Sequence, residues 1–332
     1  MTRGAGELER LGGDIKLSWQ RFLDTFEPLR PELYRYCRYL TQSPWDAEDL
    51  VQDTLARAFV TLGTLFHSLP SPRAWLFQVA SNLWIDRTRR DRRGRELLSA
   101  EAQESSVPPT VTDARAPREA AGTLLSQLAP QERAALVLKE VFDFSLEEIA
   151  TALTTTVSAV KTALHRGRGK LSEPMSEASQ APPPQVLDAF CSAFNARDLA
   201  ALTALLLSDA TTEIIGVVTE YGADAPANPH TGSLTYGLKP LIRTERGGIA
   251  SEYLEGYLDG LPRCEAREHR GVWLLLFWFD HVEGPAVRAV WTLSLEGERI
   301  ARIRNYFFAP DVVSEICAEL DVPCRTNGYR YW

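Results

Sequence analysis

The segment LAPQERAALVLKEVFDFSLEEIATALTTTVSAVKTALHRGRGKL, residues 128–171, has the most specific structural pattern in the chain. Pro130 suits the first turn of a helix, and Ser145 with Glu148 forms a capping-box pattern at the start of a second, short helix. The turn TTT follows, and Thr156 is the expected N-cap of a third helix. Two helices joined by a tight turn, the second of them basic, are typical of a helix-turn-helix.

Acidic and basic residues form separate clusters along the chain, which has 332 residues and a net charge of -8. Residues 46–53 contain four acidic residues and no basic one, whereas residues 87–95 contain six arginines and one acidic residue. Residues 161–170 are again basic, with no acidic residue. Separate acidic and basic patches predict different partners for different faces.

The acidic patch lies on an expected helix that begins after Ser43, the predicted N-cap, with Pro44 in its first position. Asp46, Asp49 and Asp53 fall on one side of this helix, opposite an apolar stripe, and we expect them to share an exposed face. Two interpretations are open: a solvated helix surface, or a docking surface for a basic partner.

The segment WLFQVASNLWIDRTRRDRR, residues 75–93, combines aromatic and basic residues on an expected helix. An amphipathic helix with buried aromatics and solvated charges is one explanation, and a nucleic-acid surface is the other. The spacing of Trp75 and Trp84 from neighbouring apolar residues favours the protein core for both side chains.

Composition limits the class of protein. The hydrophobic fraction is 45%, no apolar run is long enough to span a membrane, and the N-terminal residues lack a signal-peptide pattern, so we expect a cytoplasmic globular protein. The five scattered cysteines include no C-x-x-C pair, which argues against a disulfide framework and a zinc site. We therefore expect no metal, cofactor or membrane partner.

Two segments rich in Ser, Pro and Ala, 99–120 and 172–185, are expected linkers that divide the chain into three pieces. The third piece is predicted to be α+β. It begins with an amphipathic helix over residues 186–206 and continues with strands over 272–279, 288–295 and 299–308. Two alternating faces are predicted for the last two strands: Ala289, Trp291, Leu293 and Leu295 share one face, and Ala301, Ile303, Asn305 and Phe307 are opposite Arg302, Arg304 and Tyr306.

The segments DAEDLVQDTLARAF, PRAWLFQVASNLWIDRTRR and 128–171, in this order, closely resemble the two conserved domains of bacterial extracytoplasmic-function sigma factors of the sigma-70 family. The match covers roughly residues 18–171, and the segment AFNARDLAALTALLLSDA after it resembles the SnoaL-like domains that some of these factors carry. The resemblance implies two all-α domains, the second a helix-turn-helix, followed by an α+β cone-shaped domain. The implied order is sigma region 2 (14–95), a linker (96–120), sigma region 4 (121–171), a Pro-rich linker (172–185) and a SnoaL-like regulatory domain (186–332).

The resemblance also implies a function: binding of core RNA polymerase and promoter-specific initiation of transcription. The residues implied to contact core polymerase are Asp46, Asp49, Gln52 and Asp53. Those implied to contact the -10 promoter element are Asn82, Asp86, Arg87, Arg89, Arg90 and Arg93. Those implied to contact the -35 element are Ser158, Lys161, Thr162 and His165 on base edges, and Arg166, Arg168 and Lys170 on phosphates. The chain departs from the family pattern at Thr154, where a turn glycine is usual, and at Ala163, where an arginine is usual.

A cone-shaped domain can enclose an apolar pocket. Its candidate lining residues are Trp273, Trp278, Trp291, His230, His281 and Tyr306, with a simple aromatic core as the other explanation. Asp280 and His281 are the nearest approach to an acid–base pair, and as sequence neighbours on a strand they are expected to point in opposite directions.

We therefore expect the third domain to regulate the sigma domains and not to be an enzyme. It would do so by contacting them within the chain or by sensing a small-molecule ligand or a protein, and a separate anti-sigma factor stays open as a partner. Two alternatives remain: a one-component DNA-binding regulator with a sensing domain, and a bifunctional protein whose cone domain is an enzyme.

Overall fold

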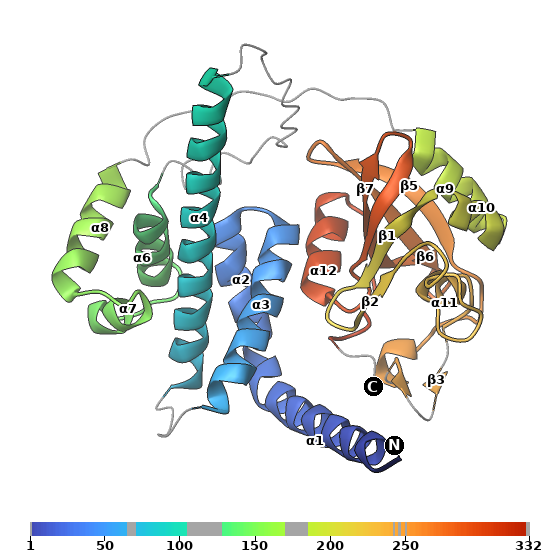
Figure 1. Cartoon of the computed structure of the whole chain (residues 1–332), viewed down its shortest axis with the longest axis horizontal. Helices are drawn as coiled ribbons and strands as arrows, with labels where there is room; N and C mark the ends of the chain where they lie inside the picture. The colour runs from blue at the N-terminus through green and yellow to red at the C-terminus, as the bar shows by residue number, and fades with distance from the viewer. Residues whose placement is uncertain are drawn as a thin grey trace. The chain divides into compact units, whose positions relative to one another are not determined.

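The computed structural model describes residues 2–64, 71–104, 128–169, 185–241, 243–244, 247–249 and 251–329. These residues form two compact units, a helical unit made largely of residues 1–176 and a C-terminal unit made largely of residues 177–332 (Figure 1). None of the helices in the described ranges is long and apolar enough to cross a membrane.

The helical unit contains no strand in its described part. Its elements are α1 (Thr2–Phe26), the 3-10 turn η1 (Glu27–Leu29), α2 (Arg30–Thr41), α3 (Pro44–Leu62), α4 (Pro72–Glu104), α6 (Pro130–Glu140), α7 (Leu146–Ala152) and α8 (Val157–Gly169).

The predicted helix starts are confirmed. Ser43 caps α3 by accepting a hydrogen bond from the backbone N–H of Asp46 at 3.3 Å, and Pro44 occupies the first turn. Ser145 and Glu148 form the predicted capping box at the start of α7. These side chains satisfy backbone N–H groups that have no partner within their own helix.

One predicted boundary differs from the structure. The helix α4 continues to Glu104, so residues 96–104, which were expected to open a linker, are helical. Residues 96–104 have the sequence ELLSAEAQE, and its Glu, Leu, Ala and Gln residues all have high helix propensity. Residues 105–120 of the first expected linker and 172–184 of the second lie outside the described residues, as do residues 121–127 and 170–171 of the expected region 4.

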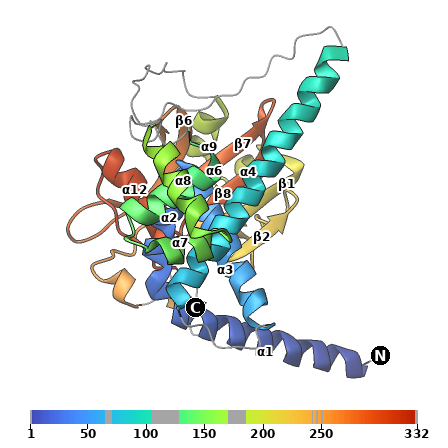
Figure 2. The same ribbon diagram turned by 90° about the vertical axis from the view of Figure 1, so that its left-hand side faces the viewer.

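The helices α6 and α7 pack against α2 and α4, as both ribbon views show (Figures 1 and 2). The contact is aromatic: the rings of Tyr36 and Phe77 stack at 4.7 Å between centroids, and Phe142 meets Phe77 edge-on at 5.2 Å. Phe144 stacks on Phe77 at 5.4 Å. Phe77 is fully buried, so it joins the expected region 2 and region 4 segments into one hydrophobic core.

The C-terminal unit is α+β, as predicted. Its elements are α9 (Gln185–Asn195), α10 (Leu199–Ala204), β1 (Leu206–Ile214), β2 (Val218–Tyr221), α11 (Ser233–Gly237), β3 (Arg243–Thr244), β4 (Gly247–Gly248), the 3-10 turn η2 (Ser251–Leu254), β5 (Arg263–His269), β6 (Val272–Phe279), β7 (Ala286–Glu296), β8 (Arg299–Asn305) and α12 (Pro310–Glu319). The strand order in the main sheet is β2-β1-β8-β7-β6-β5. Its neighbours are antiparallel except for β1 and β8, which are parallel.

The single helix predicted over residues 186–206 is wrong, because the chain turns in its middle. Arg197 adopts a left-handed conformation with φ 62°, which ends α9. Asp198 then caps α10 by accepting a hydrogen bond from the N–H of Ala201 at 2.9 Å. Leu206 already belongs to β1, whose parallel pairing with a strand almost a hundred residues later has no local signal in the sequence.

Both faces of the sheet are covered by helices (Figure 1). Ala289 and Trp291 of β7 are buried in the core that α9 contributes to, as predicted. The alternation predicted for β8 is wrong at one point, because Ile300 pairs with Leu295 and a register shift follows directly after this pair. The extra residue brings both Ile300 and Ile303 into the same core.

Arg288 on β7 is a fully buried cation with neutral partners. Its Nε donates to Oδ1 of Asn327 at 2.9 Å and its NH2 donates to the carbonyl of Tyr253, while Nδ2 of Asn327 donates back to the Arg288 carbonyl at 2.8 Å. Desolvation lowers the pKa of the Arg288 guanidinium to about 10. The C-terminal segment is therefore fixed to the sheet by a hydrogen-bonded, desolvated charge.

Candidate nucleic-acid interface

The helix α8 separates its residues into a buried and an exposed side. Thr156 caps it, as predicted, by accepting a hydrogen bond from the N–H of Ala159 at 3.2 Å. Val160 and Leu164 are buried against the neighbouring helices. The side chains predicted for the -35 element all lie exposed on this helix: Ser158, Lys161, Thr162, His165, Arg166 and Arg168. Lys170, the last member of that prediction, lies outside the described residues.

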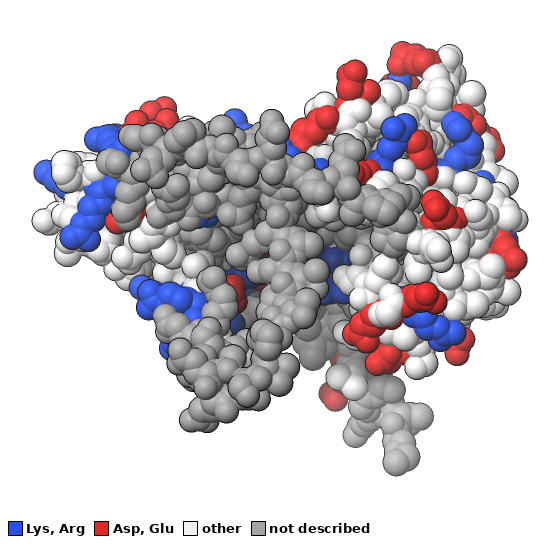
Figure 3. Space-filling view, turned by 90° about the horizontal axis from the view of Figure 1, so that it is seen from above, with Lys and Arg blue, Asp and Glu red and all other residues white. Residues whose placement is uncertain are grey.

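The position of α8 is set by its contact with α6. Gly167 is buried there, and a Cβ at this position would lie 3.7 Å from the backbone oxygen of Glu132. Arg168 forms an ion pair with Glu140 of α6, and both side chains are about half exposed. Basic side chains gather at the edge of the helical unit that α8 forms (Figure 3). A polyanion therefore meets exposed positive charge on this helix.

The turn between α7 and α8 contains an unusual residue. Thr154 adopts a left-handed conformation with φ 49°, and the N–H of Thr155 donates to the carbonyl of Ala150 at 2.8 Å. Glycine favours this conformation, whereas a β-branched residue is strained in it. The chain thus keeps the turn that the family pattern builds with glycine, at some cost in backbone strain.

The helix α4 presents the residues predicted for the -10 element. The exposed ones are Asn82, Asp86, Arg89, Arg90 and Arg93, and Arg87 is half-buried. Trp84 lies in the core, as predicted, with the guanidinium of Arg133 5.3 Å from its ring centroid. Trp75 is half-buried, and its ring centroid lies 6.0 Å from that of Phe26. The exposed side of α4 is therefore polar and basic, and Trp84 does not contribute to it.

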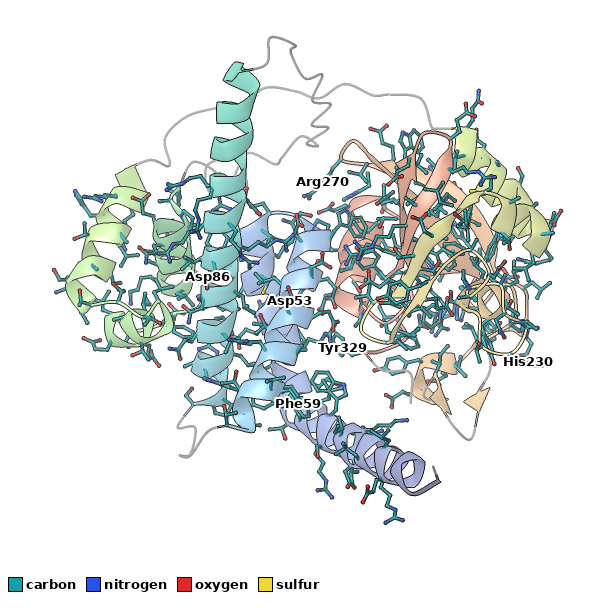
Figure 4. All side chains as sticks on the ribbon, in the orientation of Figure 1. Asp53, Phe59, Asp86, His230, Arg270 and Tyr329 are labelled. Atoms are coloured by element: carbon teal, nitrogen blue, oxygen red, sulfur yellow. The ribbon has the colours of Figure 1, made fainter. Side chains whose placement is uncertain are left out.

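The acidic residues of α3 face the arginines of α4. Oδ1 of Asp46 lies 3.4 Å from NH2 of Arg87, and Asp53 and Asp86 lie on the two neighbouring helices (Figure 4). Burial and the nearby charge of Asp49 raise the pKa of Asp53, while Arg87 and Arg90 oppose this shift. The surfaces predicted for core polymerase and for the -10 element are therefore contiguous.

The prediction that the acidic residues of α3 share an exposed face is only partly right. Asp53 is exposed, but Asp46, Asp49 and Gln52 are half-buried. The amide Nε2 of Gln52 donates to Oε1 of Glu48 at 2.7 Å, and Glu48 is fully buried in an ion pair with Arg30. Gln52 therefore satisfies a buried carboxylate, a role that the sequence pattern of α3 does not reveal.

Several residues at the contacts of α2 and α4 with the segment 130–152 were not identified from the sequence. Gln78 donates to the carbonyl of Thr151 at 3.1 Å, and Arg73 donates to the carbonyl of Phe142 at 3.3 Å. Arg133 donates to the carbonyl of Leu40 at 2.5 Å. These are contacts between segments about seventy to ninety residues apart, so no periodicity within one segment could have predicted them.

The candidate pocket residues of the C-terminal unit do not converge. Trp291 is in the core, with Trp273 packed against it, while His230 lies in an outer loop (Figure 4). Trp278 lines a cleft on the surface, and Tyr306 is fully buried. These positions favour the other explanation, a simple aromatic core, for Trp291 and Trp273.

Asp280 and His281 point to different surroundings, as expected. Oδ1 of Asp280 lies 3.7 Å from NH2 of Arg263. His281 is buried near Arg288, and desolvation with this positive charge lowers the pKa of its imidazole. In the described part of the chain, no three His, Cys, Asp or Glu side chains come together as a metal site.

Comparison with known families matches two segments of the chain. Residues 25–94 match the family Sigma-70 region 2, and residues 118–171 match Sigma-70, region 4. Both matches fall in the helical unit.

Individual relatives agree with these matches. The ECF RNA polymerase sigma factor SigL of Mycobacterium tuberculosis is 36% identical over 137 residues, which cover 40% of this chain and 76% of SigL. SigG of the same organism is 31% identical over 226 residues, which cover 57% of this chain and 60% of SigG. The crystal structure of the M. tuberculosis extracytoplasmic function sigma factor SigJ matches 85% of this chain and 95% of its own at 21% identity, with a TM-score of 0.31.

The chain spans 60% of the length of SigG, but it spans about three quarters of SigL at an identity that unrelated proteins do not reach over such a length. On this likeness, the chain belongs to the family of ECF RNA polymerase sigma factors.

Proposed function

We propose that this chain is an alternative sigma factor: it binds core RNA polymerase, directs promoter-specific initiation of transcription, and is modulated by its C-terminal unit. The observation that carries the proposal is the exposed side of α8. All six described side chains predicted to read the -35 element are exposed there, while Val160 and Leu164 of the same helix are buried. A helix exposed in this way can enter the major groove.

Within this proposal the residues of α8 have different tasks. Lys161 and the shorter polar side chains beside it reach base edges, so they determine which -35 sequence is preferred. Arg166, near the end of the helix, contacts phosphate and adds affinity for any sequence. Arg168 is already paired with Glu140, so it must exchange this partner for a phosphate.

The exposed side of α4 supports a second DNA contact. Asn82 and Asp86 would read bases of the -10 element as it melts, and Arg89, Arg90 and Arg93 would hold the adjoining phosphates. Trp84 is buried under Arg133, so stacking of an unpaired base on it would require Trp84 to leave the core. We therefore assign base capture to the polar side chains of this helix.

The packing of α6 and α7 against α4 implies that the helical unit opens on a promoter. Elements centred at -10 and -35 are about 25 base pairs apart, which is about 85 Å along B-form DNA. In the structure α4 instead contacts the segment 130–152, through the rings of Phe77 and Phe142 and the hydrogen bond from Gln78 to the carbonyl of Thr151. Engagement of both elements at once must therefore separate α6–α8 from α4.

Docking on the polymerase would use the acidic surface of α3. Asp53 is its most exposed member, and Asp49 lies on the adjoining turn. Exposed ion pairs contribute little singly, so binding would be distributed over this surface. Because Asp46 pairs with Arg87, a basic partner on α3 would also release Arg87 for DNA.

The C-terminal unit, whose sequence resembles SnoaL-like domains, would act as a regulator and not as an enzyme. Its aromatic side chains form a packed core, and Asp280 and His281 are not placed to share a proton. The C-terminal unit would act by binding a small-molecule ligand, an anti-sigma factor or the sigma domains of the same chain. As a transcription factor the protein would act in the cytoplasm.

The test is transcription in vitro with purified core polymerase and this chain, either full-length or truncated after residue 172. Initiation from specific promoters only when both chain and core are present would support the proposal, and a changed rate on truncation would support regulation. Tight, sequence-specific duplex binding without core would favour a one-component regulator. Turnover of a small molecule by the C-terminal unit would favour a bifunctional enzyme.

A further inference from the structure

Two cysteines lie close together where α12 ends. Cys317 is in the last part of α12 and is fully buried, whereas Cys324 follows the turn after this helix and is half-buried. The turn is closed by the N–H of Val322, which donates to the carbonyl of Cys317 at 3.0 Å. The pair is therefore placed by a helix end and a short turn of defined conformation.

The backbone on the other side of this turn is fixed to the sheet. Cys324 forms a parallel bridge with Val287 at the start of β7. The N–H of Val287 donates to the carbonyl of Pro323 at 2.9 Å, and the N–H of Arg325 donates to the carbonyl of Val287 at 2.9 Å. The backbones of both cysteines are thus held by hydrogen bonds, which reduces the conformational entropy that pairing their side chains would cost.

The two thiols interact directly. Hydrogen bonding from the Cys317 side chain, with a smaller contribution from Ser314, lowers the pKa of the Cys324 thiol. The same interaction and burial raise the pKa of Cys317, so this thiol keeps its proton and donates it. The outer sulfur is therefore the one of the pair that ionises more readily, and the thiolate is the nucleophilic form of cysteine.

The thiolate is accessible from a cleft. Cys324 lines a surface cleft of about 650 Å³ together with Trp278, Glu283, Pro285 and Arg325. Arg325 forms an ion pair with Glu283 across this lining. A molecule the size of a hydroperoxide can enter such a space, whereas Cys317 is fully buried and does not line the cleft.

We propose that Cys324 and Cys317 form a two-cysteine oxidation site in the C-terminal unit, with a hydroperoxide as oxidant, Cys324 as the attacking sulfur and Cys317 as the resolving sulfur. The proposal rests on the C-terminal unit alone and is independent of the sigma-factor function. A partly exposed nucleophilic cysteine beside a buried thiol is the arrangement that favours reversible oxidation.

The chemistry is balanced in two steps. The Cys324 thiolate attacks one peroxide oxygen; an S–O bond forms, the O–O bond breaks, and the leaving alkoxide or hydroxide takes a proton, which gives sulfenic acid on Cys324. Cys317 then attacks this sulfur; an S–S bond forms, the S–O bond breaks, and the hydroxide leaves as water with the proton of Cys317. In total, two thiols are oxidised to one disulfide while one hydroperoxide is reduced to an alcohol, or to water, and a second water.

The chain contains a second close thiol pair, which serves as an internal comparison. The sulfurs of Cys191 on α9 and Cys264 on β5 are 3.5 Å apart. Trypsin would leave Cys317 and Cys324 in one peptide, residues 305–325, whereas Cys191 and Cys264 fall in different peptides. A disulfide at the proposed site is therefore an internal loop in one peptide, and a disulfide at the other pair is a cross-link between two.

The experiment treats the full-length protein with stoichiometric hydrogen peroxide, blocks remaining thiols with an alkylating reagent, and analyses tryptic peptides by mass spectrometry. The expected result is that peptide 305–325 escapes alkylation, is lighter by two hydrogen atoms, and returns to its dialkylated form after reduction. Cys324→Ser should leave Cys317 as a thiol. Cys317→Ser should stop at a sulfenic acid on Cys324 that dimedone traps. Cys191→Ser is the matched control and should still form the internal disulfide.

Three outcomes would overturn the proposal: dialkylated peptide 305–325 after oxidation, oxidation of Cys317 in the Cys324→Ser variant, or a cross-link of Cys191 to Cys264 formed first. A second measurement does not depend on peroxide. The pH midpoint for alkylation of Cys324 should lie below the ~8.5 of a free cysteine and should rise toward that value in Cys317→Ala. An unchanged midpoint in folded Cys317→Ala would show that the two thiols do not cooperate.

Discussion

The two helices with predicted DNA contacts, α4 and α8, differ in how much of the fold depends on them. The helix α4 packs against α2, α3, α6 and α7, and Phe77 on its inner side is fully buried. In the described part of the chain, the main packing partners of α8 are α6 and α7. The buried side of α8 consists of small and aliphatic residues such as Val160. Both helices expose polar side chains, but only α4 also holds the helical unit together.

The charges of the two helices differ as well. On α4, Arg87 pairs with Asp46 of α3 and Arg89 lies 3.8 Å from Asp86 of its own helix. On α8, Lys161 and Arg166 are exposed. We therefore expect Lys161 and Arg166 of α8 to be available to DNA directly. Arg168 of α8 and Arg87 of α4 would first have to exchange their protein partners, Glu140 and Asp46.

The largest expected effect tests the structural role of α4. Phe77→Ala should lower the free energy of unfolding of the helical unit by about 3–5 kcal/mol, because a buried ring that contacts Tyr36, Phe142 and Phe144 is replaced by a cavity. Urea unfolding followed by circular dichroism measures this. Asn82→Ala, on the exposed side of α4, is the control and should change the unfolding free energy by less than ~0.5 kcal/mol. Similar effects of the two substitutions would contradict the division of α4 into two sides.

The second effect tests whether α8 reads sequence. Lys161→Ala should change discrimination among -35 sequences by about 1–3 kcal/mol, and Arg166→Ala should weaken all promoters to a similar extent and reduce the dependence of binding on salt. Holoenzyme binding to a set of promoters with single -35 substitutions measures both. An equal loss on every promoter with Lys161→Ala would remove that residue from base recognition.

The third effect concerns the contact that separates when the helical unit opens. Gln78→Ala removes the hydrogen bond to the carbonyl of Thr151 and should cost about 1 kcal/mol of contact between α4 and α7. Amide hydrogen exchange in α7 should become faster, and promoter binding by the holoenzyme should become tighter because less free energy is spent on opening. Unchanged exchange would show that Gln78 does not hold α7 against α4.

The smallest effect concerns the acidic surface beside α4. The pKa of Asp53 in the folded chain is raised, so the folded state holds this proton more strongly than the unfolded chain does. Stability is therefore lost as the pH rises from the unfolded pKa through the folded one, and at neutral pH the ionised Asp53 is unfavourable. Asp53→Asn should increase the unfolding free energy by less than ~1 kcal/mol at neutral pH and not at strongly acid pH.

The same substitution should weaken binding to core polymerase, because it removes one charge from the acidic surface of α3. Denaturation at two pH values and a core-binding titration measure the two consequences. A loss of stability at neutral pH, or a gain of equal size at acid pH, would contradict the electrostatic origin of the effect.

Much of the helical unit could be predicted because its signals are local. The caps at Ser43, Ser145 and Thr156 depend on residues within three positions, and the exposed side of α8 follows from helical periodicity. The site was predicted less completely. Gln52 is half-buried because it binds Glu48, whose partner Arg30 lies eighteen residues earlier in the chain.

The C-terminal unit was harder to predict for the same reason. Its sheet depends on pairing between distant strands, and a register shift near Ile300 changes which residues face the core. The turn at Arg197 is not marked by glycine or proline, so the helix before it seemed to continue. Candidate pocket residues were chosen by type, but their positions on opposite sides of one sheet could not be derived without the register.

The buried contact between Arg288 and Asn327 restricts how this sequence can change over evolutionary time. Replacing Asn327 alone leaves the Nε donor of Arg288 unsatisfied in the protein interior, at a cost of about 1–3 kcal/mol, and replacing Arg288 alone leaves Oδ1 of Asn327 without its donor. Either single step passes through a destabilised intermediate, whereas a joint replacement by apolar residues of similar volume does not. Descendants of this chain should therefore keep both residues or lose both.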